Sequence, residues 1–225
     1  LARQYGSLLI FDEVVTGFRI GLSGAQGYFG VDPDLTVFGK IIAGGYPGAG
    51  GVGGHADCMA HLGAGLDASG KKVPKAMCGG TMAATPLSCA AGYYTLCEIE
   101  RTNACEAAGR MGDRLTAGLQ ALIHKYGLPF VAFNQGSICH LDNAGTMHFA
   151  IDWKKPWTIP ELLRQTGIRQ KEMEHMGAAY MAEGIVTLAG SRLYTSAAYT
   201  EEMIDDVLSR FDRVLAGCGP LEDRP

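Results

Sequence analysis

The sequence predicts an α/β fold for residues 1–102, followed by an α+β unit over residues 103–225. Three observations support this prediction. Short apolar runs alternate with glycine-rich turns as far as residue 102. Beyond that point the pattern changes to long amphipathic helices with a few short strands between them. The chain also has 32 glycines in 225 residues, about twice the usual share, so parts of the backbone must need positive φ angles or close approach.

The strands of the first unit can be taken in order. Residues 7–11 form a continuous apolar run, which is typical of a strand buried on both faces. Further strands are expected at 35–38 and near 51–53, on either side of a glycine-rich turn. The segment 62–75 is rich in Gly, Ala and Lys and predicts a mobile loop.

Two helices are expected to follow. Pro86 opens the first, because proline is favoured in the first turn of a helix. The apolar face that we expect this helix to bury carries Leu87, Ala90, Ala91, Tyr94 and Leu96. The second helix is expected over 103–126, with apolar residues every three or four positions and Gly127 as its stop signal. It connects the two units.

The second unit continues with strands expected at 130–134, 137–141 and 147–151. Two more helices are expected, over 160–183 and 200–215. The last one begins with a threonine that can serve as its N-cap, followed by acidic residues in the first turn. These elements complete the α+β unit.

Composition excludes several classes of protein. The 19 basic and 23 acidic residues give a net charge of -4, and no basic cluster offers a nucleic-acid surface. No apolar run approaches the roughly 20 residues that span a bilayer, and no leader peptide opens the chain, so we expect a soluble cytoplasmic protein. Seven cysteines without a C-x-x-C pair argue against disulfides and a metal site, and favour buried free thiols.

Candidate chemistry lies where the first two strands end. Asp12 and Glu13 follow the first strand, and the carboxyl ends of strands are where α/β folds bind ligands. Lys40 follows the second strand among apolar and glycine neighbours, a setting that suits a Schiff-base nucleophile. Thr81 stands shortly before a helix start, where anions bind. The glycine block 44–54 lacks a convincing G-x-G-x-x-G pattern, so a nucleotide-binding domain is the weakest reading.

Several motifs in a fixed order give the strongest functional signal. They are 8–19, 33–36, Gly39-Lys40, 44–49 and Gly80-Thr81, with 196–202 near the end. Together they resemble the class III pyridoxal-phosphate aminotransferases, most closely the branch of glutamate-1-semialdehyde aminomutase and β-amino-acid aminotransferases. The resemblance implies the C-terminal part of a fold-type I transferase, in which residues 1–102 belong to the cofactor-binding large domain and 103–225 form the connector helix and small domain.

The resemblance also implies roles for individual residues. Asp12 would pair with the pyridine nitrogen of pyridoxal 5'-phosphate, and Val14 would pack on one face of the ring. Lys40 would hold the cofactor as a Schiff base and then shuttle a proton. Thr81 would bind the cofactor phosphate of the neighbouring subunit, which implies a homodimer with shared sites. Arg192 is the candidate for a substrate carboxylate.

The expected activity is transfer of an amino group between an amino acid or amine and a carbonyl compound, or an intramolecular aminomutase reaction. The alternative is a non-catalytic fragment or partner subunit; the presence of both Asp12 and Lys40 favours the enzyme. Because the chain enters a core strand at residue 7 and lacks the family's phosphate-cradling loop, we expect further polypeptide before Leu1 or on a companion chain.

Overall fold

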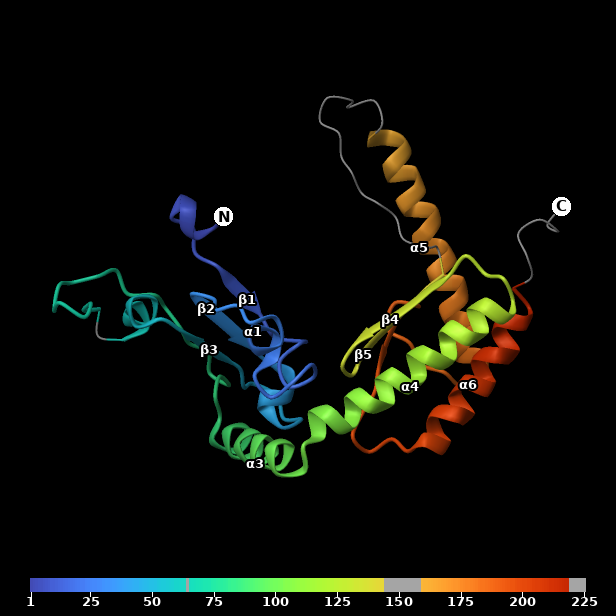
Figure 1. Ribbon diagram of the computed structural model, residues 1–225. Helices are drawn as coiled ribbons and strands as arrows, with labels where there is room; N and C mark the ends of the chain where they lie inside the picture. Colours follow the sequence, from blue (N-terminus) through green and yellow to red (C-terminus); the bar gives the residue numbers. More distant parts are fainter. Residues whose placement is uncertain (64, 144–158, 219–225) are drawn as a thin grey trace. The chain divides into compact units, whose positions relative to one another are not determined.

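A computed structural model describes residues 1–63, 65–143 and 159–218, with side chains from 170 onward in the last range (Figure 1). The chain divides into two compact units, Leu1–Glu106 and Ala107–Pro225. Within those ranges, every helix is either too short or too polar to cross a membrane.

The first unit contains a three-stranded sheet of β1 (Ile10–Asp12), β2 (Leu35–Phe38) and β3 (Gly51–Gly54), in that order. β1 and β2 are parallel, with Asp12 opposite Val37, and β3 is antiparallel to β2. The strands expected at 35–38 and 51–53 are confirmed. Because β1 and β2 run in the same direction, the residues that follow them emerge at one edge of the sheet.

The prediction of a first strand buried on both faces is wrong. Of residues 7–11 only Ile10 and Phe11 lie in β1, and the flanking Leu8 and the strand residue Ile10 are 58% and 54% exposed. Within the described residues β1 has a strand partner on one side, β2, and so lies at the edge of the sheet. A strand with one neighbour leaves part of its apolar surface uncovered, which the sequence pattern does not reveal.

The described part of the first unit has several helical segments. They are η1 (Arg3–Tyr5), α1 (Gly24–Phe29), η2 (Lys40–Ala43), α2 (Ala56–Met59), η3 (Ala60–Leu62) and α3 (Pro86–Thr102). Within the segment expected to be a loop, residues 66–72 form a tight antiparallel turn, because Leu66 pairs with Lys72 and Asp67 accepts hydrogen bonds from the backbone N–H groups of Ser69 and Lys71.

Helix α3 begins at Pro86, as predicted, but it buries a different face. Leu87 and Tyr94, both expected inside, are 62% and 71% exposed, whereas Ser88 and Gly92 are buried. The small side chains face the interior because another stretch of backbone lies too close for larger ones. The hydrophobic periodicity of the sequence therefore predicted the wrong buried face for α3.

The described part of the second unit contains β4 (Val131–Gln135), β5 (Ile138–Asp142), α5 (Ile159–Ala182), β6 (Arg192–Tyr194), α6 (Glu201–Ala216) and, from Ala107 onward, α4 (Ala104–Lys125). The strands form an antiparallel sheet in the order β4-β5-β6. These helices and the first two strands confirm the sequence prediction, and Gly127, at φ +59°, follows α4 as the expected stop. The strand expected at 147–151 lies outside the described residues.

One face of this second sheet packs against helices to form the core of the unit. The most buried hydrophobic side chains, each at most 1% exposed, are Leu119, Cys139, Leu141, Tyr180, Ile204, Phe211 and Leu215. The rings of Tyr180 and Phe211 meet edge to face with centroids 5.0 Å apart. Helices α4 and α6 run side by side (Figure 1), and Arg114 and Lys125 of α4 bond Asp205 and Asp212 of α6.

The cysteines agree only in part with the prediction. All seven are free thiols, but among them only Cys139 is buried, while Cys78, Cys89 and Cys97 are exposed. Cys89 and Cys97 lie on the side of α3 that the first unit leaves uncovered. For these two cysteines, the prediction of buried thiols is wrong for the same reason as the predicted buried face of α3.

Candidate active site

Asp12 is the last residue of β1 and lies at the carboxyl edge of the parallel pair. Its Oδ1 accepts a hydrogen bond from the backbone N–H of Val14 at 3.0 Å. The residue is exposed, and no other partner of its carboxylate lies within the described ranges. One carboxylate oxygen is therefore committed to its own turn, and the other is available to a ligand.

Lys40 begins η2 at the same edge of the sheet, two residues after β2 ends. Its φ is +49°, a left-handed conformation that costs a non-glycine residue roughly 1–3 kcal/mol. Such a conformation persists when the surrounding structure holds it, and it is concentrated at functional sites. Although its sequence neighbours are apolar, Lys40 is exposed in the described chain.

A close contact joins the segment after Asp12 to the residue before Lys40. A Cβ placed on Gly39 would lie 3.2 Å from Cγ1 of Val14. Glycine at this position therefore leaves room for the Val14 side chain, which packs directly against the start of the lysine turn. The structure thus brings Asp12, Val14 and Lys40 together at one sheet edge.

Helix α3 holds the lysine turn from the other side. A Cβ on Gly92 would lie 2.0 Å from the carbonyl oxygen of Ile42, and one on Gly44 would lie 2.6 Å from backbone atoms of Ala91. Gly44 also has φ +59°, which no other residue adopts as easily. These contacts show that η2 packs closely on α3, backbone against backbone, directly after Lys40.

The threonine motif lies against the loop that follows η2. The backbone N–H of Ala84 donates to the Gly48 carbonyl at 2.6 Å, and Ser88 Oγ donates to the Pro47 carbonyl at 2.6 Å. Thr81 itself is exposed in the turn that these contacts anchor. Within the described residues its hydroxyl does not bond Asp12 or Lys40, so one chain does not join the threonine to the other two.

Arg192 is the first residue of β6 in the second unit and is exposed. It stands in register with His140 on β5, which in turn faces Phe133 on β4. The Phe133 and His140 rings stack at 4.8 Å with an 8° interplanar angle. Burial, and then the nearby charge of Arg192, lowers the pKa of His140, which favours the neutral imidazole. The sequence analysis did not single out Phe133 or His140 beside Arg192. The alternation of side chains between the two faces of β4 and β5 is the signal that could have placed them together.

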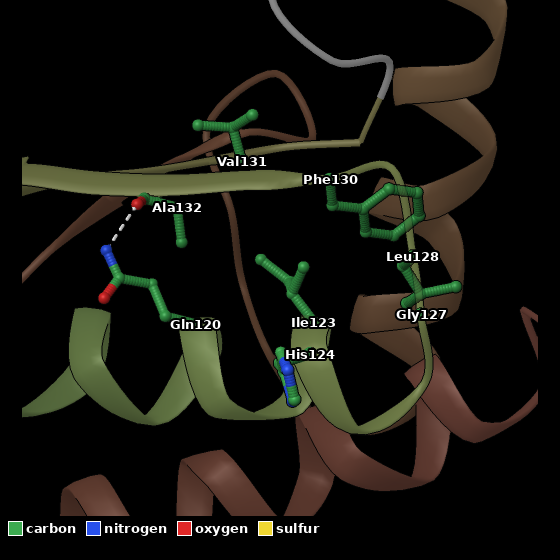
Figure 2. A pocket seen from close by; sticks show the side chains of 8 residues that line it. All are labelled: Gln120, Ile123, His124, Gly127, Leu128, Phe130, Val131 and Ala132. Carbon is green, nitrogen blue, oxygen red and sulfur yellow. Dashed lines mark hydrogen bonds between the residues drawn. The ribbon is translucent and has the colours of Figure 1, made fainter.

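A pocket of the second unit lies between the end of α4 and β4 (Figure 2). Apolar side chains such as Ile123 and Phe130 line it, and Gln120 Nε2 crosses it to donate to the Ala132 carbonyl at 3.0 Å. None of the residues predicted for the site is among its lining. Gln120 thus supplies a hydrogen-bond donor to a backbone carbonyl of β4, which lies at the edge of the sheet in the described residues. This is a structural role for the polar side chain of the pocket.

The arrangement in the first unit suits one kind of chemistry. A carboxylate with a free oxygen can accept a hydrogen bond from a protonated ring nitrogen, and a lysine amine can condense with a carbonyl carbon. The residues that carry this arrangement match a known family: residues 1–214 match the model of the class III aminotransferases. The chain belongs to that family.

Curated relatives and solved structures agree with the family. The chain is 36% identical to glutamate-1-semialdehyde 2,1-aminomutase 1 of Macrococcus caseolyticus over 220 residues, covering 96% of this chain and 46% of the relative. It is 35% identical to the aminomutase of Pyrobaculum islandicum, covering 93% and 45%. It therefore spans about half the length of the curated relatives it matches.

Among solved structures, an omega-transaminase from Sphaerobacter thermophilus has a TM-score of 0.74 at 26% identity, covering 96% of this chain and 45% of that one. A beta-phenylalanine aminotransferase from Variovorax paradoxus has a TM-score of 0.73 at 25% identity, covering 98% and 46%. These likenesses confirm the fold class: the chain has part of the fold-type I fold of pyridoxal-phosphate transferases.

Proposed function

We propose that the protein is a pyridoxal-phosphate enzyme that transfers an amino group between an amino acid or amine and a carbonyl compound, or moves it within one molecule. One observation carries the proposal: Asp12 and Lys40 emerge at the same edge of the sheet and are linked through the contact of Val14 with Gly39. The relatives named aminomutases and the neighbours named transaminases keep both reactions within the proposal.

The residues at this edge fit pyridoxal phosphate. The uncommitted oxygen of Asp12 can accept a hydrogen bond from the pyridine nitrogen, and the amine of Lys40 has no hydrogen-bond partner in the described ranges. Val14, already packed on Gly39, offers an apolar side chain at the same place. When bound, the cofactor supplies an electron sink for the substrate carbanion. Asp12 then keeps the ring nitrogen protonated, and Lys40 moves a proton on and off the substrate carbon.

Absorbance spectroscopy of the purified protein tests the proposal. With pyridoxal phosphate, we expect a visible band distinct from that of the free cofactor, because attachment to a lysine changes the conjugation of the aldehyde. Amino donors should bleach this band, and a carbonyl acceptor should restore it. A protein that gives no such band, or a band that no amino compound changes, would support the non-catalytic alternative instead.

We further propose that Thr81 acts across a homodimer, binding the cofactor phosphate that the partner's lysine holds. Two observations support it: the threonine turn is fixed to the loop after η2, and its hydroxyl is exposed without contact to Asp12 or Lys40 of its own chain in the described residues. Arg192 completes the proposal as the group that binds a substrate carboxylate, since its guanidinium is exposed and can form two parallel hydrogen bonds.

A mixing experiment tests the shared site. The variants Lys40→Ala and Thr81→Val are each assayed at limiting cofactor, where loss of one bond to a charged phosphate weakens binding by roughly 10-fold or more. If sites are shared, a hybrid dimer of the two variants has one intact site, so an equal mixture should recover about a quarter of the wild-type activity. If Thr81 serves its own chain, both sites of the hybrid are defective and mixing recovers nothing.

A further inference from the structure

Glu13, directly after Asp12, is a buried carboxylate for which the proposed reaction has no use. It is 1% exposed, and no described basic side chain forms an ion pair with it. Glutamate is rarely buried in this way unless hydrogen bonds replace its hydration. A buried charge beside a proposed cofactor ligand therefore needs its own explanation.

The hydrogen bonds that replace hydration all come from the segment that follows. Oε2 accepts from the Thr16 hydroxyl at 2.6 Å, and Oε1 accepts from the backbone N–H groups of Ala25 at 2.6 Å and Gln26 at 3.2 Å. Ala25 and Gln26 lie in the first turn of α1, whose N-cap residue Ser23 makes no side-chain cap bond. The glutamate thus caps a helix that begins eleven residues away from it in the chain.

The surrounding backbone is shaped to admit this carboxylate. A Cβ on Gly24 would lie 2.6 Å from Oε1 of Glu13, and Gly24 has φ +59°. A Cβ on Gly17 would lie 2.7 Å from the Glu13 carbonyl oxygen, which accepts from the Gly17 N–H at 3.0 Å. The loop over residues 14–24 therefore packs against Glu13 both near its start, at Gly17, and at its end, at Gly24.

Glu13 is also flanked by the proposed cofactor site. Its N–H donates to the Val37 carbonyl at 2.8 Å, which extends the β1–β2 pairing one residue past Asp12. On its other side, the Val14 N–H bonds Asp12 and the Val14 side chain packs on Gly39. Any shift of the Glu13 backbone would displace Asp12 on one side and Val14 on the other.

We propose that Glu13 is a positioning residue. Its buried carboxylate closes the loop 14–24 and thereby fixes Asp12 and Val14 against the Gly39-Lys40 turn. The inference rests on the proposed function to the extent that Asp12 and Lys40 hold the cofactor. It adds a group that contacts neither cofactor nor substrate and acts through its two neighbours.

The test uses Glu13→Gln, which keeps the size of the side chain but leaves the Thr16 hydroxyl or a helix N–H facing an amide NH2. We expect pyridoxal phosphate to bind roughly 10-fold more weakly, as the loss of a buried bond to a charged group implies. The spectrum of the bound cofactor should also shift, because Asp12 no longer holds the ring nitrogen in place. Thr16→Val should act in the same direction, whereas Thr16→Ser, which keeps the hydroxyl, should resemble the wild type.

Glu100→Gln, on an exposed position of α3, is the matched control. Cofactor affinity, the bound spectrum and the thermal midpoint are measured for every variant. If Glu13→Gln and Thr16→Val lower only the thermal midpoint, with affinity and spectrum equal to the control, the positioning role is wrong and the proposed function stands. If the wild-type protein binds no pyridoxal phosphate, both proposals are overturned. Should Glu13→Gln fail to fold, the Thr16 pair decides alone, since it removes one hydroxyl from the same carboxylate.

Discussion

Lys40→Ala should abolish covalent attachment of pyridoxal phosphate and lower turnover by roughly 1,000-fold or more. The lysine would lose both its nucleophilic amine and its proton-transfer role, and proton transfer by a positioned group contributes about 10²- to 10⁴-fold. Its left-handed backbone lies between the contact of Val14 with Gly39 and the close packing of η2 on α3. Borohydride reduction of the wild-type holoprotein, followed by peptide mass mapping, should place the adduct on Lys40.

The loop lysines provide the control for this experiment. Lys71, Lys72 and Lys75 are exposed in the segment before the threonine turn, and Lys71→Ala should leave attachment and turnover unchanged. An adduct mapped to any of these three lysines contradicts the assignment. So does a Lys40→Ala protein that still gives a reducible adduct.

Asp12→Asn should leave some cofactor bound but lower turnover by roughly 100- to 1,000-fold, the range seen when one electrostatic group is removed from an active site. Asparagine keeps an oxygen for the Val14 N–H, so the turn after β1 can survive while the negative charge is lost. Without that charge the ring nitrogen loses its proton and the cofactor accepts electrons poorly.

Comparison with Asp12→Ala separates the charge from the hydrogen bond to Val14. Steady-state turnover and cofactor affinity are measured for both variants. We expect similar losses of turnover in the two, with weaker cofactor binding in the alanine variant because its turn also loses an acceptor. Near-normal turnover of Asp12→Asn would contradict the role assigned to the charge.

Local signals in the sequence located most of the helices and strands. Pro86 marked the start of α3, Gly127 marked the end of α4, and Thr200 caps α6 by accepting from the Met203 N–H at 3.3 Å. Proline, glycine and threonine act through their own backbone or side-chain geometry. Their effect therefore depends on the few residues next to them and can be predicted from the sequence. The predicted ends of the first two strands likewise pointed to Asp12 and Lys40, since α/β folds bind ligands at the carboxyl ends of strands.

The same local signals did not predict which side chains are buried. Ile10 of β1 and Leu87 and Tyr94 of α3 are exposed, while Ser88 and Gly92 are buried. What covers a side chain depends on segments far away in the sequence. At Gly92 the space is set by the carbonyl of Ile42, fifty residues earlier. Hydrophobic periodicity predicts the face of an element that is usually buried. This prediction is wrong where another backbone segment packs so closely that only small side chains fit.

The sequence by itself determined the order of the elements, the family resemblance and the two residues proposed for the chemistry. Tertiary structure decided how those residues are held: the contact of Val14 with Gly39, the close packing of η2 on α3, and the burial of Glu13 under the start of α1. The physical reason is that residue type fixes what a group can do, whereas a hydrogen bond or contact between distant segments exists only once the chain has folded. Glu13 shows the difference, since its carboxylate is plain in the sequence and its three hydrogen bonds are not.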